Sequence, residues 1–467
     1  MSLMRHVRNI HFVGIAGVGM CGIAEVLKNS GCNVSGSDLS DSGIVQHLRD
    51  IGIDVSVGHV GKNVENADVV VQSTAVKEGN VEIITARALK IPVIPRAEML
   101  AELMRTKQGI AIAGTHGKTT TTSLVSSILA YGGLDPSFVI GGKLNSLGAN
   151  AKLGQSPYFI AEADESDASF LFLKPVMAVV TNIDEDHMTT YNGDFNQLQS
   201  TFLEFLQHLP FYGLAALCMD DPKVIELMAE LNRPILTYGF HPEADVQAVD
   251  WQQNGLSNEF TVRRKARPDL SIKLNLPGKH NVQNALAAIA IATEIGVTDE
   301  VISQALSLFQ GVGRRFQMRG EVSFGKGNAL LIDDYGHHPR EITSTIDAIR
   351  NVWPQKRLVH VFQPHRYSRT EALFDEFSES LVKSDEIVLL DIYSAGEEPV
   401  DGICSQSLAD KMRKLAKDKS IAVTPISGVD GVLSKLVQEG DILLMQGAGS
   451  IGTLAKDLSE SHQVQVD

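Results

Sequence analysis

The stretch Ile110-Ala111-Ile112-Ala113-Gly114-Thr115-His116-Gly117-Lys118-Thr119-Thr120 decides the fold, because an apolar run passes through glycines into a polar helix start. Glycines let successive backbone N–H groups converge on an anion at a helix N-terminus, where the helix dipole favours negative charge. The stretch predicts a strand, a phosphate-binding loop and a helix. Lys118 is then expected to reach the β- and γ-phosphates of a nucleotide, and the Thr119 hydroxyl to bind Mg²⁺.

The match to the phosphate-loop pattern G-x-x-x-x-G-K-[ST] is incomplete. Ile112 stands where the first glycine belongs, which leaves a shortened G-x-x-G-K-T. The alternative is a glycine turn between strand and helix that binds nothing. The strand–loop–helix context favours the phosphate loop.

Composition narrows the class of protein. A chain of 467 residues suggests roughly three domains of ~150 residues. The 41 Lys+Arg residues against 56 Asp+Glu give a net charge of −15, which disfavours a general nucleic-acid or anionic-membrane surface. We therefore expect an enzyme that acts on small molecules and holds any nucleotide with locally placed cations.

The location of the protein is predicted from its cysteines and its apolar segments. Cys21, Cys32, Cys218 and Cys404 are scattered and show no C-x-x-C spacing, which fits neither a disulfide framework nor a zinc site. No stretch approaches the ~18 consecutive apolar residues of a membrane span, and no signal-peptide pattern is present. The sequence predicts a cytoplasmic protein that is not inserted in a membrane.

The N-terminal region carries a second glycine motif. A strand over Asn9–Val13 is followed by G-x-G-x-x-G at Gly17, Gly19 and Gly22, and then by a helix. These glycines are typical of a pyrophosphate-binding turn, and Asp38, about 20 residues on, ends the next strand, where it can accept from a ribose hydroxyl or a base. Taken alone the motif suggests NAD; a Rossmann-like turn without a ligand is the alternative.

Further strands in this region deliver polar residues at their carboxyl ends, where open parallel sheets bind ligands. Ser73 and Thr74 follow the apolar run 67–72, and Arg96 follows the run 91–94. Arg96 is the preferred local cation, although a solvated arginine at a helix start fits its position equally well. The polar residues 105–108 mark the first domain boundary.

The central region adds a carboxylate cluster beside the predicted phosphate loop. A strand over Tyr158–Ala161 delivers Glu162-Ala163-Asp164-Glu165-Ser166-Asp167, and Glu162, nearest the strand end, is the best candidate to hold Mg²⁺. An acidic solvated loop is the alternative. Another strand, Val176–Val180, leads to Asn182 and His187, which we also place near the γ-phosphate, although a lone histidine is often structural.

A later helix and a glycine-arginine segment close the central region. Lys279-His280-Asn281-Val282-Gln283-Asn284 precede an alanine-rich helix over 285–292, and the amide side chains of this stretch can contact a base; an N-capped core helix is the alternative. Gly311-Val312-Gly313-Arg314-Arg315-Phe316 is interpreted as a hinge whose arginines reach a phosphate or pair on the surface.

The last region repeats the α/β pattern. Strands over 330–332 and 358–362 end in Asp333-Asp334-Tyr335-Gly336-His337-His338-Pro339 and Gln363-Pro364-His365-Arg366-Tyr367-Ser368-Arg369. Two more strands, 387–390 and 442–445, precede another G-x-G-x-x-G at residues 447–452. Zinc at His337 and His338 is disfavoured, because adjacent histidines face different directions. The hypothesis from topology is that three domains point their strand-end loops at a shared cleft.

These parts together favour ATP-driven joining of a nucleotide-linked acid to a second small molecule. In such a reaction ATP is expected to phosphorylate a carboxylate, and an amine is expected to attack the acyl phosphate to give an amide, ADP and phosphate. We expect Lys118 and Mg²⁺ to neutralise charge on the transferring phosphoryl group, where catalysis is mainly positioning and electrostatics.

Four of the quoted motifs, at 114–120, 162–167, 333–339 and 363–369, together resemble the Mur ligase family, and the resemblance covers essentially the whole chain. It implies a three-domain α/β fold with a Rossmann-like N-terminal domain, a central P-loop ATPase-like domain and a C-terminal Rossmann-like domain. The expected ranges are 1–106 for the UDP-sugar, 107–316 for ATP and 317–467 for the amino acid. It also implies ATP, Mg²⁺, UDP-N-acetylmuramate and L-alanine as ligands, domain closure, and cytoplasmic synthesis of a peptidoglycan precursor.

The resemblance also assigns residues. The residues implied for the UDP-sugar are Gly17, Val18, Gly19 and Asp38, to which Ser73, Thr74 and Arg96 are added from their positions at strand ends. Those implied for ATP are Gly114, Thr115, His116, Gly117, Lys118, Thr119, Thr120, Asn281, Asn284, Arg315 and Asp334. The implied metal positions are Thr119, Glu162 and His187. The residues implied to be catalytic are Lys118, His187, His337, Arg366 and Arg369, of which the last three lie near alanine and the reacting carboxyl.

One departure from the wider family is informative. Several relatives use a carbamylated lysine shortly after the metal-binding histidine, but this chain has no lysine between Lys174 and Lys223. The carbamylated lysine is therefore expected to be absent, as in the alanine-adding branch. The ligands of a second metal stay open.

Three other functions remain as alternatives. A muropeptide-recycling ligase of the same family shares the phosphate loop, but we expect it to lack the pattern at 363–369. An NAD-dependent oxidoreductase explains the turn at 17–22 and not Lys118, and a non-catalytic nucleotide-binding regulator needs no acidic cluster at Glu162. The choice of alanine over glycine or serine, the oligomeric state, the general base and the order of binding are not set by the sequence.

Overall fold

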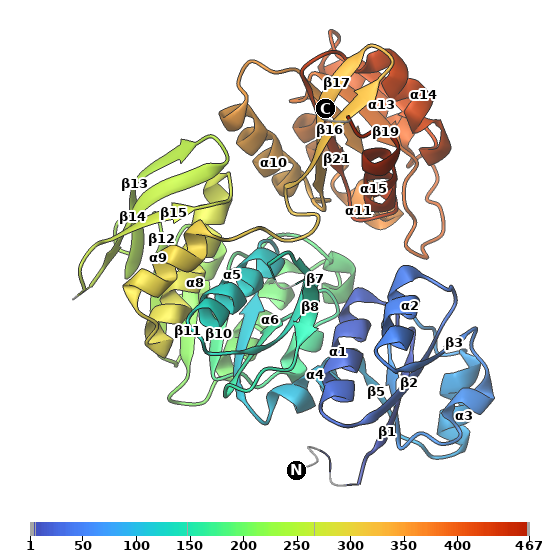
Figure 1. Cartoon of the computed structure of the whole chain (residues 1–467), viewed down its shortest axis with the longest axis vertical. Coiled ribbons are helices and arrows are strands. Elements are labelled where there is room, and N and C mark those ends of the chain that lie inside the picture. The colour runs from blue at the N-terminus through green and yellow to red at the C-terminus, as the bar shows by residue number, and fades with distance from the viewer. Residues whose placement is uncertain (1–3, 5, 147, 266, 465–467) are drawn as a thin grey trace. The chain divides into compact units, whose positions relative to one another are not determined.

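The computed structural model describes residues 4, 6–146, 148–265 and 267–464, and within them the strands form three sheets with intervening helices (Figure 1). The predicted α/β class is confirmed. The chain forms two compact units, which are described separately. Unit 1 comprises Met1–Asp250, Phe260–Ile272 and Gln283–Gln310, and unit 2 comprises Trp251–Glu259, Lys273–Val282 and Gly311–Asp467.

The N-terminal sheet has the strand order β3-β2-β1-β4-β5, and each neighbouring pair is parallel. Helices α1 and α2 lie on one side of it and α3 on the other (Figure 1). The elements are β1 (Asn9–Val13), α1 (Val18–Asn29), β2 (Asn33–Asp38), α2 (Gly43–Asp50), β3 (Asp54–Val57), β4 (Val69–Gln72), α3 (Val81–Ala88), β5 (Val93–Pro95) and α4 (Arg96–Met104). Because both faces are covered, all residues of β1 except Asn9 are buried, and the predicted bounds of this strand are confirmed.

The central sheet has the order β15-β14-β13-β12-β11-β10-β6-β9-β7-β8. Strand β6 lies between β10 and β9 and is parallel to both, so the loops that follow these strands emerge at one edge. Its strands are β6 (Gln108–Ala113), β7 (Ser137–Leu144), β8 (Ala149–Lys152), β9 (Tyr158–Glu162), β10 (Met177–Val180), β11 (Leu214–Cys218), β12 (Ile235–Gly239), β13 (Val246–Asn254), β14 (Ser257–Arg264) and β15 (Leu270–Leu274). Its helices are α5 (Lys118–Tyr131), α6 (Phe195–Gln207), α7 (Pro222–Met228), α8 (Lys279–Ile295) and α9 (Asp299–Ser307).

The C-terminal sheet has the order β16-β17-β21-β18-β19-β20, parallel except for the β16–β17 hairpin. Neighbouring residues on one strand face opposite cores: Leu331 lies in one apolar cluster and Ile332 in the other. The strands are β16 (Gln317–Phe324), β17 (Gly327–Asp334), β18 (Leu358–Phe362), β19 (Glu386–Leu390), β20 (Ser420–Thr424) and β21 (Asp441–Gln446). The helices are α10 (Pro339–Val352), α11 (Tyr367–Ala372), α12 (Phe374–Leu381), α13 (Ser405–Leu415), α14 (Val429–Leu436) and α15 (Ile451–Ser461).

Unit 1 contains an interface between the N-terminal sheet's helices and the central sheet. Helix α1 packs on the hairpin β7–β8, where the Asn150 Nδ2 group donates to Cys21 Sγ at 3.3 Å. A single apolar cluster runs from the N-terminal sheet through Leu100 and Leu103 of α4 to the central sheet. The glycine turn before α1 and the loop after β6 are thus parts of one packed body.

No helix in the described part of the chain is both long enough and apolar enough to cross a membrane.

A buried carboxylate ties the β2 end to α3 in unit 1. Glu82 has no exposed surface and accepts hydrogen bonds from Ser37 Oγ at 2.5 Å and Asn63 Nδ2 at 2.6 Å. The rings of His11 and His59 lie 3.6 and 3.4 Å from its Oε2. Burial alone would raise the pKa of Glu82, but the hydrogen bonds from Ser37 and Asn63 and the nearby His11 ring outweigh burial and lower the pKa to about 2.

This depressed pKa predicts acid sensitivity. Because the folded pKa of Glu82 lies below its unfolded value, its stabilisation is present above about pH 4.5 and is lost as pH falls toward 2. We expect Glu82→Gln to lower the free energy of unfolding at pH 7 by about 1–3 kcal/mol, measured by urea titration. Between pH 4.5 and 3 the wild type should lose stability more steeply than the variant. The exposed Glu65→Gln control should match the wild type, and parallel pH curves for Glu82→Gln would contradict the assignment.

Candidate active site

The loop between β6 and α5 has the backbone of a phosphate-binding turn. Gly114 and Gly117 have φ of 122° and 86°, in the left-handed region that favours glycine. A Cβ atom at Gly114 would lie 2.0 Å from Thr181 Oγ1, and one at Gly117 would lie 2.4 Å from Asn284 Oδ1. Both glycines are therefore required by conformation and by space, and α5 begins directly after them with its N-terminus at the loop.

Lys118, the first residue of α5, folds back over this loop. Its Nζ donates to Gly114 O at 2.6 Å and Thr115 O at 3.1 Å, and to the two carboxylate oxygens of Glu165 at 2.9 and 2.8 Å. Burial lowers the pKa of Lys118, but Glu165, Asp164 and Glu162 outweigh it and hold the pKa above its usual value. A fixed, fully charged ammonium at a helix N-terminus suits an anionic phosphate.

Glu165 is the buried partner of that ammonium. Its side chain is 3% exposed, and Tyr191 Oη donates to its backbone carbonyl. Burial raises the pKa of Glu165 to about 7, although Lys118 opposes the rise. The sequence pointed to the acidic segment as a whole but assigned no role to this residue.

Thr119 and Glu162 offer oxygen atoms side by side. Thr119 Oγ1 donates to Glu162 Oε2 at 3.2 Å, and Gly141 N donates to Glu162 Oε1 at 2.6 Å. A hydroxyl and a carboxylate are the hard donors that Mg²⁺ prefers, so this pair fits that ion. His187 lies in the loop after β10 at a φ of 55°, with its Nε2 3.5 Å from Asp186 Oδ2.

Two further residues expected at ATP lie on α8. Asn284, in unit 1, accepts from Thr121 Oγ1 at 3.2 Å and faces Gly117, so the structure brings it to the phosphate loop. Asn281, in unit 2, donates through Nδ2 to Pro277 O at 2.7 Å.

The N-terminal glycine turn is held by its predicted acidic residue. Asp38 Oδ2 accepts from Ala16 N at 3.0 Å, so this carboxylate fixes the turn that leads to Gly17 and Gly19. Ser73 packs against Gly14 of the same turn, and Thr74 lies beside it in an exposed position. Val18 begins α1, and its side chain lies outside the described residues.

Arg96 connects this turn to the acidic segment of the phosphate site. Its guanidinium packs against Gly19, where an added Cβ atom would lie 2.9 Å from Nη1. Arg96 Nη2 donates to Asp164 Oδ2 at 3.3 Å. Burial raises the pKa of Asp164, but the charges of Lys118 and Arg96 outweigh burial, so the pKa lies below its usual value. The glycine turn before α1 and the loop after β6 are therefore joined by the series Gly19, Arg96, Asp164 and Lys118, the last two through their opposite charges.

In unit 2, residues predicted for the nucleotide and the acceptor lie around the end of β17. Asp334 accepts from Phe316 N at 2.9 Å and from Gln446 Nε2 at 2.7 Å. The guanidinium of Arg315 lies 4.9 Å from the Tyr335 ring centroid, a cation–π distance. His337 Nδ1 is 3.2 Å from Tyr335 O, and its backbone N–H donates to Glu341 at 2.8 Å.

The segment after β18 joins this group. The rings of His337 and His365 lie 5.8 Å apart, and Arg369 Nη1 is 3.3 Å from His365 Nδ1. Arg366 has a φ of 70°, a strained value for a residue with a side chain, and its Nη1 lies 3.5 Å from Glu397 Oε1. Such strain is often found at functional sites.

In the G-x-G-x-x-G motif at 447–452, backbone groups form hydrogen bonds with side chains of unit 2. Arg314 Nη2 donates to Gly447 O, and Gln363 Oε1 accepts from Ile451 N at the start of α15 at 3.0 Å. Arg314 also pairs with Asp333 at 3.2 Å, so it supports this turn and the β17 end. We assign this motif a packing role.

The sequence analysis did not identify the acidic residues that contact the predicted site residues. Asp164, Glu165, Asp184, Glu341 and Glu397 each contact a predicted site residue or its loop. The density of acidic residues after β9 was a signal, but a carboxylate's partner depends on how chain segments meet in three dimensions.

Comparison with known proteins finds relatives that match along the chain. Family models match along the chain: "Mur ligase family, catalytic domain" at residues 9–108, "Mur ligase middle domain" at 112–292 and "Mur ligase, glutamate ligase domain" at 314–449. A curated UDP-N-acetylmuramate–L-alanine ligase of Legionella pneumophila (strain Lens) is 60% identical over 98% of this chain and 97% of its own length.

Solved structures agree with these matches. A UDP-N-acetylmuramate–alanine ligase of Thermotoga maritima superposes with a TM-score of 0.82 at 29% identity, covering 97% of this chain and 99% of the other. A murein peptide ligase of Psychrobacter arcticus gives a TM-score of 0.74 at 25% identity, covering 98% and 100%. On the evidence of its phosphate loop, its glycine turn and these relatives, the chain belongs to the Mur ligase family.

Proposed function

We propose that this protein joins L-alanine to the carboxyl group of UDP-N-acetylmuramate, consuming ATP and releasing ADP and phosphate, in peptidoglycan precursor synthesis. The observation that carries the proposal is the phosphate loop with Lys118 packed in one unit with a pyrophosphate-type glycine turn. The Legionella relative, which bears the name of this activity and is similar over nearly the whole chain, supports it. We also propose a cytoplasmic location.

The reaction proceeds through an acyl phosphate. A carboxylate oxygen of the sugar acid attacks the γ-phosphorus of ATP, and the bond to ADP breaks. The alanine amine then attacks the acyl carbon, the C–O bond to phosphate breaks, and the amine loses a proton to solvent or a base. Lys118 and the N-terminus of α5 stabilise the negative charge of the transferring phosphoryl group.

The remaining predicted residues divide between the substrates. Gly17, Gly19 and Arg96 bind the UDP diphosphate, while Asp38 keeps the turn in place. Thr119, Glu162 and His187 would hold Mg²⁺, which would supply charge neutralisation at the phosphates. Asn281, Asn284, Arg315 and Asp334 contact the nucleotide, and His337, Arg366 and Arg369 contact alanine and the reacting carboxyl. We propose 1–106, 107–316 and 317–467 as the domains for the three substrates.

The first test is phosphate release from ATP with Mg²⁺ and UDP-N-acetylmuramate. We expect the highest kcat/KM with L-alanine among L-alanine, glycine, L-serine, D-alanine and a tripeptide. Lys118→Ala should lose at least about 1,000-fold, because the transferring phosphoryl charge loses its cation. Lys223→Ala, at an exposed ion pair on α7, is the matched control. Preference for the tripeptide would move the protein to the recycling branch, and no turnover with any acceptor would refute the ligase.

The metal assignment predicts a specific defect. Chelation of divalent cations should abolish phosphate release, and Glu162→Gln should raise the Mg²⁺ concentration for half-maximal turnover by about 10-fold or more, since one charged ligand is lost. Thr119→Val should act in the same direction, whereas Thr201→Val on α6 should behave as wild type. An unchanged Mg²⁺ titration in both site variants would contradict the assignment.

The acceptor site is tested by Arg366, which is 44% exposed and therefore a poor candidate for a folding defect. Arg366→Ala should raise the KM for alanine or lower kcat by about 100-fold, because a charged hydrogen-bond donor to the carboxylates is lost. The KM for ATP should change by less than about 3-fold. Arg413→Ala, an exposed pair on α13, serves as control, and full activity of Arg366→Ala would exclude the residue from the site.

A further inference from the structure

The side chain of Asn182, two residues after β10, forms hydrogen bonds with both the backbone N–H and the backbone carbonyl of His116. His116 N donates to Asn182 Oδ1 at 2.8 Å, and Asn182 Nδ2 donates to His116 O at 3.0 Å. One amide side chain thus satisfies both the backbone hydrogen-bond donor and the backbone acceptor of a residue in the phosphate loop. The pairing has the pattern of a backbone ladder but is made by a side chain.

The residues on either side of Asn182 hold the rest of the loop. Thr181 Oγ1 donates to His116 O at 2.6 Å, and its backbone N donates to Ala113 O at 3.1 Å. Thr115 N donates to Asn182 O at 3.0 Å, and Asp184 N donates to Thr115 Oγ1 at 2.9 Å. Residues 113, 115 and 116 are therefore each bonded to 181–184, while Gly114 packs closely against Thr181.

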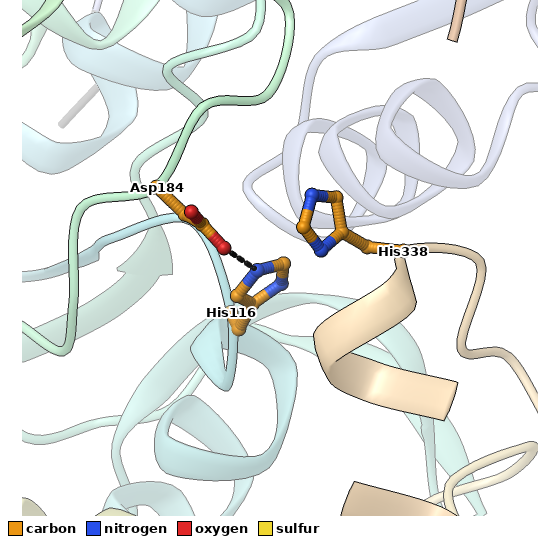
Figure 2. Close-up of side chains that lie close together, drawn as sticks. All are labelled: His116, Asp184 and His338. Carbon is orange, nitrogen blue, oxygen red and sulfur yellow. Dashed lines mark hydrogen bonds and ion pairs between the residues drawn. The ribbon is translucent and has the colours of Figure 1, made fainter. Parts of the chain in front are cut away.

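The ring of His116 is oriented by the same segment. Figure 2 shows the imidazole facing the carboxylate of Asp184, with Nε2 3.1 Å from Oδ2. Both side chains are largely buried, at 16% and 12% exposure, so the contact is little weakened by solvent. Backbone and ring of His116 are thus set by residues two positions apart on one loop.

Fixing this loop also fixes Lys118. The Lys118 ammonium donates to the carbonyls of Gly114 and Thr115, so its position depends on a loop whose shape is set from β10. A loop that is ordered before the ligand arrives does not lose backbone entropy on binding, and each residue left to be ordered costs about 10-fold in affinity.

We propose that residues 181–184 form a clamp that pre-orders the phosphate loop, with Asn182 as a positioning residue for the β- and γ-phosphates of ATP. This inference rests on the proposed function, because it assumes that the loop binds ATP. It concerns a different set of residues from those that touch the phosphates.

The test measures ADP and ATP binding in the presence of Mg²⁺ by calorimetry, with no acceptor present, in the full chain. Asn182→Ala should weaken binding by about 10- to 100-fold and raise the KM for ATP similarly, because the His116 N–H loses its acceptor and His116 O keeps the Thr181 hydroxyl but loses the Asn182 amide. The KM for UDP-N-acetylmuramate should change by less than about 3-fold, and the thermal midpoint only slightly. Asn196→Ala, at an exposed asparagine on α6, is the control.

A second variant guards against misfolding. Thr181→Val keeps the shape of the residue and removes only the hydroxyl that bonds His116 O, so a smaller loss in the same nucleotide-specific pattern is expected. Asp184→Asn keeps a hydrogen-bond acceptor for His116 and should bind nucleotide better than Asp184→Ala.

The outcomes separate the two proposals. Wild-type affinity for ADP and ATP in Asn182→Ala, or an equal loss in both substrates' KM together with the thermal midpoint, would overturn the clamp. A wild-type protein that binds neither nucleotide would instead overturn the proposed function.

Discussion

The structure depends on the turn that connects β6 to α5, where the chain must pass through left-handed backbone at Gly114 and Gly117. Neighbouring side chains lie so close to both residues that a Cβ atom has no room at either. The turn places the N-terminus of α5 and the Lys118 ammonium at the carboxyl edge of the central sheet. The loops after β9 and β10 emerge at the same edge, because β6 pairs in parallel with both strands. The acidic segment and the clamp follow from this placement.

A second constraint joins the glycine turn before α1 to this edge. Helix α1 packs on the β7–β8 hairpin, and Arg96 lies between Gly19 and Asp164. An arginine at the start of a helix is unfavourable for the helix dipole, so its position requires a partner that compensates. Asp164 is that partner in unit 1, and it also lowers the cost of holding Lys118 in a largely buried position. We propose that the ligase uses these turns for its two nucleotide substrates.

Much of this was predictable from sequence because local patterns set it. The phosphate loop, the strand bounds of β1 and β18, and the end of α5 at Tyr131 follow from apolar runs and glycines, and the α/β class was confirmed. Strand β4 begins at Val69, two residues after the predicted start at Ala67, since residue-level strand ends depend on pairing with β1. Two sets of contacts were not predictable: the pairing of Glu165 with Lys118, and the hydrogen bonds of Arg314 and Gln363 with the glycine motif at 447–452. They join residues that lie 47 to 133 positions apart in the sequence. The ligand-binding and catalytic roles of all the predicted site residues stay predictions.

The proposed reaction depends on activation of the sugar carboxyl as an acyl phosphate, and this step can be followed most directly through the carboxyl oxygen. UDP-N-acetylmuramate labelled with oxygen-18 in both carboxyl oxygens would be turned over with ATP and L-alanine, and the released phosphate analysed by mass spectrometry. Each phosphate is expected to carry one labelled oxygen, because the attacking carboxylate oxygen leaves with the phosphoryl group when the amine adds. Phosphate without label, with both labelled oxygens accounted for elsewhere, would contradict it.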